Sequence, residues 1–563
     1  MNQTSKDVSI NYAISLFKQG RVKKSLKETL NAKKNYPDEP FIYNLLGVLY
    51  AHLGSYQKST AHYSKAIKLN PKYFEAYNNA GVAYTSWEKN DEAIKYFDRA
   101  IQINPLYAEA HNNEGNALKE KGEYQLAAAS YEKSISLNPS YIDAISNAGM
   151  VYDIMNDFTK AERYFKQALS LDPTNASLRH NLANCHYNRA NTFTEAERIE
   201  DAEENYRKAI HLDPKHTRAH LNLGLIHQKR GQIKEGLSII KKILEFEVNH
   251  AETNHSIGIM SLQLGRFPEG WRYFEYRWKI PQFKDIVWSI QDKPLWKGER
   301  GKRVAVWREQ GIGDQIIFLG LLPEVKEMCA SLSVYVDPRL HALCRHAMPE
   351  INFVKDLKEL QNVECDYHLP IQSLGGLVRN DISDFDRTVK GYLKADPKRV
   401  EAIRQELQLD GKTVIGISWK SMDTNYKKKS IQLRDMERLF SGLDVVLVNL
   451  QYGDVDDEIR EFRQATGIDV VQCASVDNRE DLDGLAALIE ACDLVVSTSN
   501  VTVHLAGALA KETWVLLHYV SIYYWLVERT DSIWYPSLSL YRQPTLDDWD
   551  SVYRTIRKDL EKR

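Results

Sequence analysis

The chain has 563 residues, of which 43% are hydrophobic and 27% are charged, and its formal net charge is −2 at pH 7. This is the composition of an ordinary globular protein, and the length predicts several domains. A nearly neutral charge argues against partners such as nucleic acid or an anionic membrane. The sequence begins without a signal-peptide pattern and holds no apolar run long enough to cross a bilayer. We therefore expect a cytoplasmic protein without membrane insertion.

The first half of the chain carries a repeat of 34 residues. Proline recurs at this interval at Pro37, Pro71, Pro105, Pro139 and Pro173. Glycine keeps the same interval at Gly47, Gly81, Gly115 and Gly149. This period is typical of tetratricopeptide repeats, helical hairpins that stack to bury their apolar faces. We expect each proline to start a helix and each glycine to mark a close approach between two helices.

One hairpin is longer than the others. The interval grows to 41 residues between Pro173 and Pro214, and again between Ala183 and Gly224. This predicts an insertion of seven residues, which we place within residues 191–200. The original register resumes at Gly258, so the repeats are expected to extend to about residue 281.

An asparagine stands two residues before the glycine position in five successive repeats. These residues are Asn79, Asn113, Asn147, Asn181 and Asn222. An asparagine side chain offers a donor and an acceptor that suit an extended peptide backbone. The row resembles the asparagine ladder of the O-GlcNAc transferase repeat domain, and this resemblance implies that it binds an acceptor polypeptide along the concave face. The alternative is that the asparagines only solvate the inner surface.

The second half alternates short apolar strands with helical stretches. Strands are predicted at residues 304–307, 413–418, 445–449, 470–472 and 494–497. This alternation predicts parallel sheets covered by helices on both faces. The first strand leads directly into Gly311 and Gly313 and then into a helix, a geometry that directs backbone N–H groups at an anion. Two such sheets that face a shared cleft indicate a GT-B type glycosyltransferase.

Six ordered segments make this resemblance specific. They are EQGIGDQIIF (309–318), GISWKS (416–421), KKKSIQL (427–433), NLQYGD (449–454) and the segments 481–517 and 532–543. They resemble bacterial repeat-containing glycosyltransferases related to the ADP-heptose lipopolysaccharide heptosyltransferases, a group that includes flagellin glycosyltransferases. The implied fold is an α-solenoid of tetratricopeptide repeats (1–281) followed by an α/β GT-B unit with two Rossmann-like domains (282–400 and 401–563).

The resemblance also assigns site residues. Asp314 matches the aspartate that serves as general base in the heptosyltransferase-like enzymes, and its alternative role is a helix cap. The implied donor-binding residues are Gly311, Gly313, Lys420, Ser421, Lys429, Ser430, Gln451, Tyr452, Ser499, Asn500, Thr502 and His504. A solvated cluster is the alternative for Lys429, and a buried structural role is the alternative for His504. Arg542 is a further candidate partner of phosphate.

The chain departs from the heptosyltransferases at one turn. Ser499 stands where their aspartate stands, and Asn500 stands at the following threonine, which weakens the case for an ADP-heptose donor. No metal site is expected, because the acidic stretches 454–458 and 481–483 have the character of polar loop and helix start. The six cysteines also lack the paired spacing of a zinc site or a disulfide framework.

These features lead to one expected function and two alternatives. We expect a metal-independent, inverting protein O-glycosyltransferase without a cofactor, which moves a sugar to Ser or Thr of flagellin held by the repeats. The resemblance suggests a CMP-linked nonulosonic acid, such as pseudaminic acid, as the nucleotide-sugar donor. The alternatives are a glycosyltransferase of lipopolysaccharide or capsule, and a repeat scaffold or chaperone with an inactive nucleotide-like domain.

Overall fold

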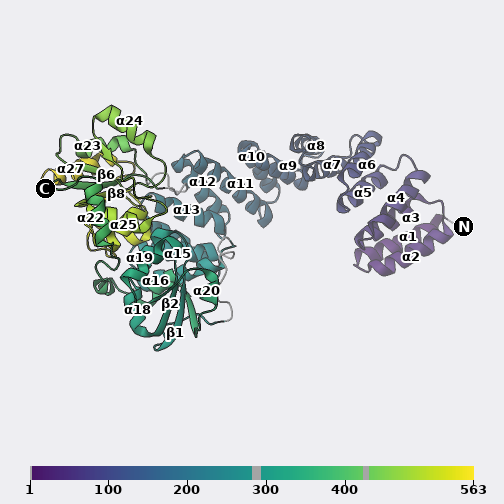
Figure 1. Cartoon of the computed structure of the whole chain (residues 1–563). Coiled ribbons are helices and arrows are strands. Elements are labelled where there is room, and N and C mark those ends of the chain that lie inside the picture. Colours follow the sequence, from purple (N-terminus) through teal and green to yellow (C-terminus); the bar gives the residue numbers. More distant parts are fainter. Residues whose placement is uncertain (1–2, 282–292, 422–429) are drawn as a thin grey trace. The chain divides into compact units, whose positions relative to one another are not determined.

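The computed structural model describes residues 3–281, 293–421 and 430–563 (Figure 1). These residues form two compact units, Met1–Ala219 and His220–Arg563. Lys429, which we expect to bind the donor, lies outside the described residues. Among the described residues, none of the helices is both long enough and apolar enough to span a bilayer.

The first unit consists of helical hairpins. Its helices are α1 (Gln3–Lys18), α2 (Val22–Asn35), α3 (Pro40–His52), α4 (Tyr56–Leu69), α5 (Phe74–Ser86), α6 (Asn90–Ile103), α7 (Ala108–Glu120), α8 (Tyr124–Leu137), α9 (Ile142–Ile154), α10 (Phe158–Leu171), α11 (Ala176–Glu195) and α12 (Ile199–Leu212). From α3 to α10, a first helix of 13 residues alternates with a second helix of 14. The predicted helical repeats are confirmed.

The repeated glycines lie where the two helices of a hairpin touch. A Cβ atom built on Gly81 would lie 2.5 Å from the ring of Phe97 in the second helix, and one on Gly115 would lie 2.6 Å from the ring of Tyr131. Both rings are buried. The predicted close approach of the two helices is therefore confirmed.

The five prolines of the 34-residue repeat do not start helices, which corrects the expectation from the sequence. Pro71 lies in the turn before α5, whose first residue is Phe74. The Asn70 side chain closes this turn by accepting a hydrogen bond from the Lys72 backbone N–H at 3.1 Å. The Asn-Pro pair is thus a turn signal, because asparagine bonds its own backbone two residues on.

The insertion lengthens a helix instead of a loop. Helix α11 has 20 residues where the corresponding helix α9 has 13, a difference of 20 − 13 = 7. Seven residues make about two helical turns, so the added length preserves the face that the helix presents. The next helix, α12, then begins after a connection of the same length as that between α9 and α10.

The second unit opens with the last repeat helices. They are α13 (Thr217–Lys229), which begins just before the unit boundary, α14 (Ile233–Lys241), α15 (Ala251–Gln263) and α16 (Phe267–Phe274), with the short helices η1 (Lys242–Glu245) and η2 (Glu275–Lys279). The sequence predicts a repeat domain up to residue 281, whereas α14 to α16 lie in the same compact unit as both sheets. The domain boundaries at 281 and 400 stay predictions.

Two parallel sheets follow these helices. The first has the strand order β3 (Asn352–Val354), β2 (Cys329–Tyr335), β1 (Lys302–Trp307) and β4 (Tyr367–Pro370). The second has the order β10 (Leu538–Arg542), β9 (Thr513–Leu517), β8 (Leu494–Thr498), β5 (Val414–Ser418), β6 (Val446–Asn449) and β7 (Val470–Val471). All paired strands in both sheets run parallel, so the two predicted parallel sheets are confirmed.

Helices connect the strands of both sheets. Those of the first sheet are α17 (Ile312–Leu319), α18 (Leu322–Met328), α19 (His341–Ala347), α20 (Leu357–Gln361) and α21 (Gly375–Val378). Those that lead into and through the second sheet are α22 (Pro397–Glu406), α23 (Glu437–Phe440), α24 (Asp456–Thr466), α25 (Leu482–Ala491), α26 (Val501–Ala508) and α27 (Trp549–Leu560). Short 3₁₀ helices are η4 (Pro338–Leu340), η5 (Ile371–Leu374), η6 (Ile382–Arg387), η8 (Leu433–Met436) and η9 (Tyr523–Trp525).

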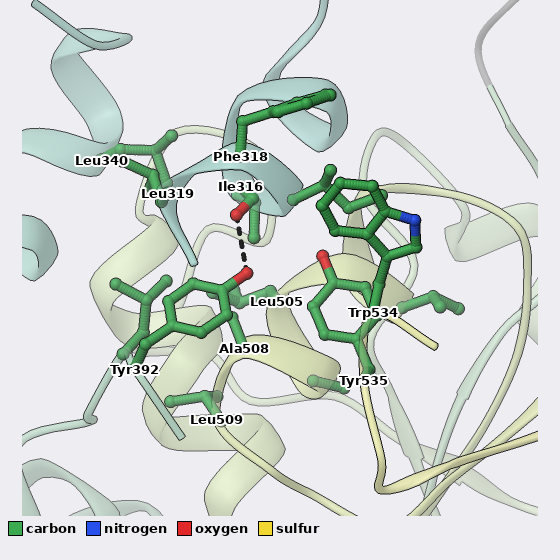
Figure 2. Close-up of a cluster of buried hydrophobic side chains, with 14 of the residues drawn as sticks. Ile316, Phe318, Leu319, Leu340, Tyr392, Leu505, Ala508, Leu509, Trp534 and Tyr535 are labelled. Atoms are coloured by element: carbon green, nitrogen blue, oxygen red, sulfur yellow. Dashed lines mark hydrogen bonds between the residues drawn. The ribbon is translucent and has the colours of Figure 1, made fainter. Parts of the chain in front are cut away.

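One hydrophobic core joins the two sheets. It contains residues of β1 and β2 from the first sheet and of β5 and β8 from the second. At its centre, side chains of α17 meet side chains of α26 (Figure 2). Tyr392 lies between these helices and donates a hydrogen bond from its hydroxyl to the Ile316 carbonyl at 2.6 Å. The first helix after β1 therefore packs on the first helix after β8.

Candidate functional site

Asp314 lies at the turn that follows β1. The N-cap of α17 is Gly311, so Asp314 is the third residue of the helix and not its cap. Its carboxylate lies close to Gly311 at the start of the helix: Oδ2 lies 3.4 Å from the position that a Cβ on Gly311 would take. A carboxylate in the first turn is stabilised by the positive end of the helix dipole. Its charge is thus held at the carboxyl end of β1, the edge of a parallel sheet where ligands bind.

Gly313 allows this turn to pack against α26, the helix that follows β8 of the second sheet. A Cβ on Gly313 would lie 2.9 Å from Cδ2 of His504, a residue of α26. His504 is buried, its Nδ1 lies 3.3 Å from the Tyr535 hydroxyl, and its ring stacks on Trp525 with centroids 5.4 Å apart. The structure therefore brings together three predicted site residues, Gly313, Asp314 and His504. The aromatic surroundings of His504 favour a positioning role for its ring.

Two buried amide side chains fix the carboxyl-end edge of the second sheet. Gln451, after β6, accepts hydrogen bonds through Oε1 from the Ser418 hydroxyl and from the backbone N–H groups of Trp419 and Lys420, at 2.9–3.0 Å. Asn500, after β8, donates to the Ser418 hydroxyl at 2.7 Å and caps α26 by accepting from the Thr502 N–H at 3.0 Å. Both amides thus tie neighbouring strands to the end of β5.

Ser418 is the centre of this arrangement, and sequence reasoning missed it. It is the last residue of β5 and is fully buried. The available signal was a hydroxyl that ends an otherwise apolar strand within GISWKS. Thr502 is also internally bonded, since its hydroxyl donates to the Leu450 carbonyl at 3.3 Å. Gln451, Asn500 and Thr502 therefore shape the edge of the sheet, and their direct contact with a donor stays a prediction.

Lys420 has an acidic partner that the sequence did not reveal. Its Nζ lies 2.7 Å from Oε2 of Glu458 in α24, and the other oxygen of Glu458 accepts from the Trp419 indole at 2.7 Å. The Lys420 side chain is about one-third exposed. Because Glu458 offsets its charge, Lys420 attracts a phosphate less strongly than an unpaired lysine would.

The remaining predicted donor residues lie around the same edge. The Ser421 backbone N–H donates to the Ser430 hydroxyl at 3.0 Å. Tyr452 is half-buried, and its carbonyl accepts from the Gln451 side chain at 3.2 Å. Ser499 lies in the turn before α26, where its hydroxyl accepts from the Trp525 indole at 2.9 Å.

Tyr523 is a further residue near Asp314 that the sequence did not single out. It lies in η9 and is buried. Burial, reinforced by the nearby Asp314 carboxylate, raises the pKa of Tyr523 well above its usual range. Its hydroxyl is therefore a neutral donor, and among the described residues this hydroxyl has no hydrogen-bond partner.

A buried ion pair anchors the turn that carries Asp314. The Arg277 guanidinium, in η2, donates to both carboxylate oxygens of Glu309 at 3.0 Å, and both side chains are almost fully buried. Glu309 also accepts from the Gln372 backbone N–H at 3.0 Å. Burial raises the pKa of Glu309, and Arg277 acts against this rise. The last repeat helices are thereby bonded to the segment five residues before Asp314.

The asparagine row makes bonds between repeats. Asn79 donates to the Asn44 side chain at 3.1 Å, and Asn113 donates to the Asn78 side chain at 3.0 Å. Asn147 donates to Asn112 at 2.9 Å and to Asn116 at 3.1 Å. These bonds give the row a structural role that the sequence did not suggest.

The other members of the row are placed similarly in their helices. Asn181 in α11 and Asn222 in α13 are half-buried, as are the first three. A half-buried asparagine amide keeps further hydrogen-bonding capacity for a ligand. Peptide binding by the row stays a prediction.

Comparisons with protein families identify the helical repeats. Models described as "Tetratricopeptide repeat" match residues 74–107, 108–141, 140–215 and 193–253, and one described as "TPR repeat" matches residues 49–86. The chain therefore contains tetratricopeptide repeats. Such arrays serve as protein-interaction scaffolds.

A curated relative extends the similarity beyond the repeats. The chain is 27% identical over 373 residues to "Protein FlbA" of Caulobacter vibrioides, and the match covers 61% of each protein. Less than two-thirds of that relative's length is therefore spanned.

Solved structures resemble parts of the chain. A TPR repeat-containing protein from Cytophaga hutchinsonii is 17% identical and covers 44% of this chain and 99% of its own, with a TM-score of 0.38. MamA is 26% identical and covers 31% of this chain and 94% of its own, with a TM-score of 0.27. YrrB, described as "a TPR protein with an unusual peptide-binding site", is 20% identical and covers 34% and 96%, with a TM-score of 0.28.

Proposed function

We propose that this chain is a protein glycosyltransferase of the GT-B type. The repeat array binds a polypeptide acceptor, for which flagellin is our candidate, and the unit with the two sheets binds a nucleotide sugar. The observation that supports this best is the contact between Gly313 and His504. This contact joins the first turn of α17, which follows β1, to the first turn of α26, which follows β8. The carboxyl-end edges of the two sheets, where parallel sheets generally bind ligands, thus lie near Asp314.

In the proposed reaction, Asp314 is the general base. Its carboxylate takes the proton from an acceptor Ser or Thr hydroxyl, and the hydroxyl oxygen forms a bond to the anomeric carbon of the sugar as the bond from that carbon to the phosphate oxygen breaks. This is a single displacement that inverts the anomeric carbon. Backbone N–H groups at the start of α26 stabilise the departing phosphate, assisted by Lys429.

The donor is proposed from the resemblance. Ser499 replaces the aspartate of the ADP-heptose enzymes, which supports a different nucleotide sugar, and our candidate is a CMP-linked nonulosonic acid. The seryl hydroxyl leaves this turn without a negative charge, so an anionic sugar meets less repulsion here than it would beside an aspartate.

A second candidate function is a scaffold that binds protein but transfers no sugar. It is favoured by the pairing of Lys420 with Glu458 and by the internal hydrogen bonds of Gln451 and Asn500. Under this candidate, the polar groups at the sheet edge would serve the fold alone.

Nucleotide binding separates the two candidates. We would titrate the full-length protein with CMP, ADP, UDP and GDP by calorimetry. Selective binding of CMP supports the proposed donor, and selective binding of ADP or UDP would support the transferase with a different donor. A folded protein that binds none of the four contradicts the transferase and supports the scaffold.

The assignment of Asp314 has its own test. We expect Asp314→Asn to lower the rate of sugar transfer to purified flagellin by about 10²- to 10⁴-fold, because the general base is lost. Nucleotide affinity should stay within about twofold of the wild type, since the base faces the acceptor. Asp550→Asn, which changes an exposed first-turn carboxylate of α27, is the matched control. Full transfer by Asp314→Asn would refute the assignment.

A further inference from the structure

Arg542 lies at the ligand-binding edge of the second sheet. It is the last residue of β10 and pairs in register with Leu517, the last residue of β9. Its guanidinium donates to the Ser521 hydroxyl, to the Leu526 carbonyl at 2.8 Å and to the Trp525 carbonyl at 3.2 Å. All three acceptors are neutral. Within the described ranges, no carboxylate forms an ion pair with Arg542.

Four other buried or partly buried arginines of this unit each form an ion pair with a carboxylate. Arg277 pairs with Glu309, Arg379 with Glu324, Arg339 with Asp337 and Arg399 with Asp481. Arg542 has no carboxylate partner among the described residues, and burial lowers its pKa to about 10. A shielded charge without a counterion destabilises the folded protein. Such a charge is most easily explained by a ligand that supplies the missing negative charge.

The guanidinium retains donors for such a ligand. An arginine has five N–H donors, and three are used by Ser521, Trp525 and Leu526. Its Nε is buried and has no hydrogen-bond acceptor among the described residues. Arginine is the side chain best suited to pair with a planar or tetrahedral oxyanion through more than one N–H group.

The surroundings of Arg542 connect it to the predicted phosphate turn. Trp525, whose carbonyl accepts from Arg542, donates its indole N–H to Ser499 at 2.9 Å. Trp525 therefore contacts both groups, Arg542 through its backbone carbonyl and Ser499, the residue before the N-cap of α26, through its indole. An anionic ligand at that turn would lie along the same edge of parallel strands as Arg542.

We propose that Arg542 and Ser521 form an oxyanion subsite at the carboxyl end of β10. The subsite takes a carboxylate or a phosphate group. The identification of its carrier as the nucleotide-sugar donor rests on the proposed function, and the two sources of the oxyanion are then the carboxylate of a nonulosonic acid and the phosphate of the nucleotide.

The competing explanation is that Arg542 only braces the loop after β9. Leu526, whose carbonyl it binds, has a positive φ of 48°. The two explanations predict opposite effects of a neutral substitution. If Arg542 only braces the loop, Arg542→Gln should destabilise the protein. If Arg542 is an uncompensated charge, Arg542→Gln should cost little stability but should lose anion binding.

The test uses the full-length protein and three probes: inorganic phosphate, CMP and the nonulosonate N-acetylneuraminate. Each is titrated by calorimetry into the wild type, Arg542→Gln and Arg542→Lys. We expect Arg542→Gln to weaken binding of at least one probe by tenfold or more, Arg542→Lys to retain part of the affinity, and the melting temperature of Arg542→Gln to stay close to that of the wild type. Arg529→Gln is the matched control, because Arg529 already pairs with Asp531.

The outcomes separate the subsite from the proposed function. Loss of phosphate and CMP binding identifies a phosphate site, and loss of N-acetylneuraminate binding alone identifies a carboxylate site. If CMP binds the wild type and Arg542→Gln equally and N-acetylneuraminate does the same or does not bind, the subsite is refuted while the transferase stands. If inorganic phosphate binds through Arg542 and no nucleotide binds, the subsite stands while the transferase fails. If Arg542→Gln does not fold, Ser521→Ala and Arg542→Lys replace it, and unchanged binding in both refutes the subsite.

Discussion

At the scale of single residues, the pair of Arg277 and Glu309 connects the repeats to the predicted chemistry. Arg277 lies in η2 at the end of the repeat helices, and Glu309 lies in the turn that leads to Asp314. Ser373 and Glu275 complete the bonding of Arg277, with distances of 2.8 Å each. Because both charges are buried, their mutual bonds decide whether the turn keeps its shape.

Replacing one member of this pair should destabilise the protein far more than replacing both members. We expect Arg277→Met to lower the free energy of unfolding of the sheet unit by about 3–5 kcal/mol, because Glu309 would remain buried without a counterion. The double variant Arg277→Met/Glu309→Leu should recover most of this loss. The measurement is the calorimetric melting transition of the full-length protein. If the double variant were less stable than Arg277→Met, the hydrogen bonds of Glu309, and not the balance of charge, would be what stabilises the turn.

At the scale of elements, the glycine positions define how each hairpin packs. Gly81 in α5 allows the Phe97 ring of α6 to lie against the helix backbone. In the lengthened hairpin, the same position is Ala183, which is fully buried. In the next hairpin, Gly224 lies equally close to an aliphatic side chain, because a Cβ there would lie 2.3 Å from Ile240.

Filling one of these positions should loosen one hairpin. We expect Gly81→Val to reduce the local stability of α5 and α6 by roughly 1–3 kcal/mol, because the new side chain overlaps the Phe97 ring. Faster amide hydrogen exchange in these two helices is the measurement. Ser86→Val, at an exposed position of the same helix, should change exchange little. Equal exchange in Gly81→Val and Ser86→Val would contradict the steric explanation.

The elements could be predicted from the sequence far better than the contacts within the site. The repeat period, the inserted turns of α11 and the parallel strands all follow from local patterns that recur every few residues. The bond between Gln263 and Ser521 joins residues 258 positions apart, and no local pattern encodes it. For the same reason, the sequence indicates the asparagine row but not the hydrogen bonds that join its members to neighbouring repeats.

At the scale of the whole molecule, the last repeat helices belong to the compact unit of the sheets. The Gln263 side chain of α15 donates to the Ser521 carbonyl at 2.9 Å, and the Gln263 backbone carbonyl accepts from the Val527 N–H at 3.2 Å. The Trp271 indole of α16 donates to the Arg379 carbonyl at 2.7 Å. These helices therefore contact the segments after β9 and after β4, which belong to different sheets.

Two fragments test whether the sheets need these helices. We expect the fragment 217–563, which begins with α13, to fold cooperatively and to bind nucleotide like the full chain. The fragment 282–563 lacks Gln263, Trp271 and Arg277, so it exposes apolar surface and leaves Glu309 buried without its partner. It should therefore melt at a lower temperature or aggregate, as measured by calorimetry and size-exclusion chromatography. If the shorter fragment were as stable and as soluble as the longer one, the repeat helices would be an appendage to the sheet unit, and Arg277 would have no part in holding the turn of Asp314.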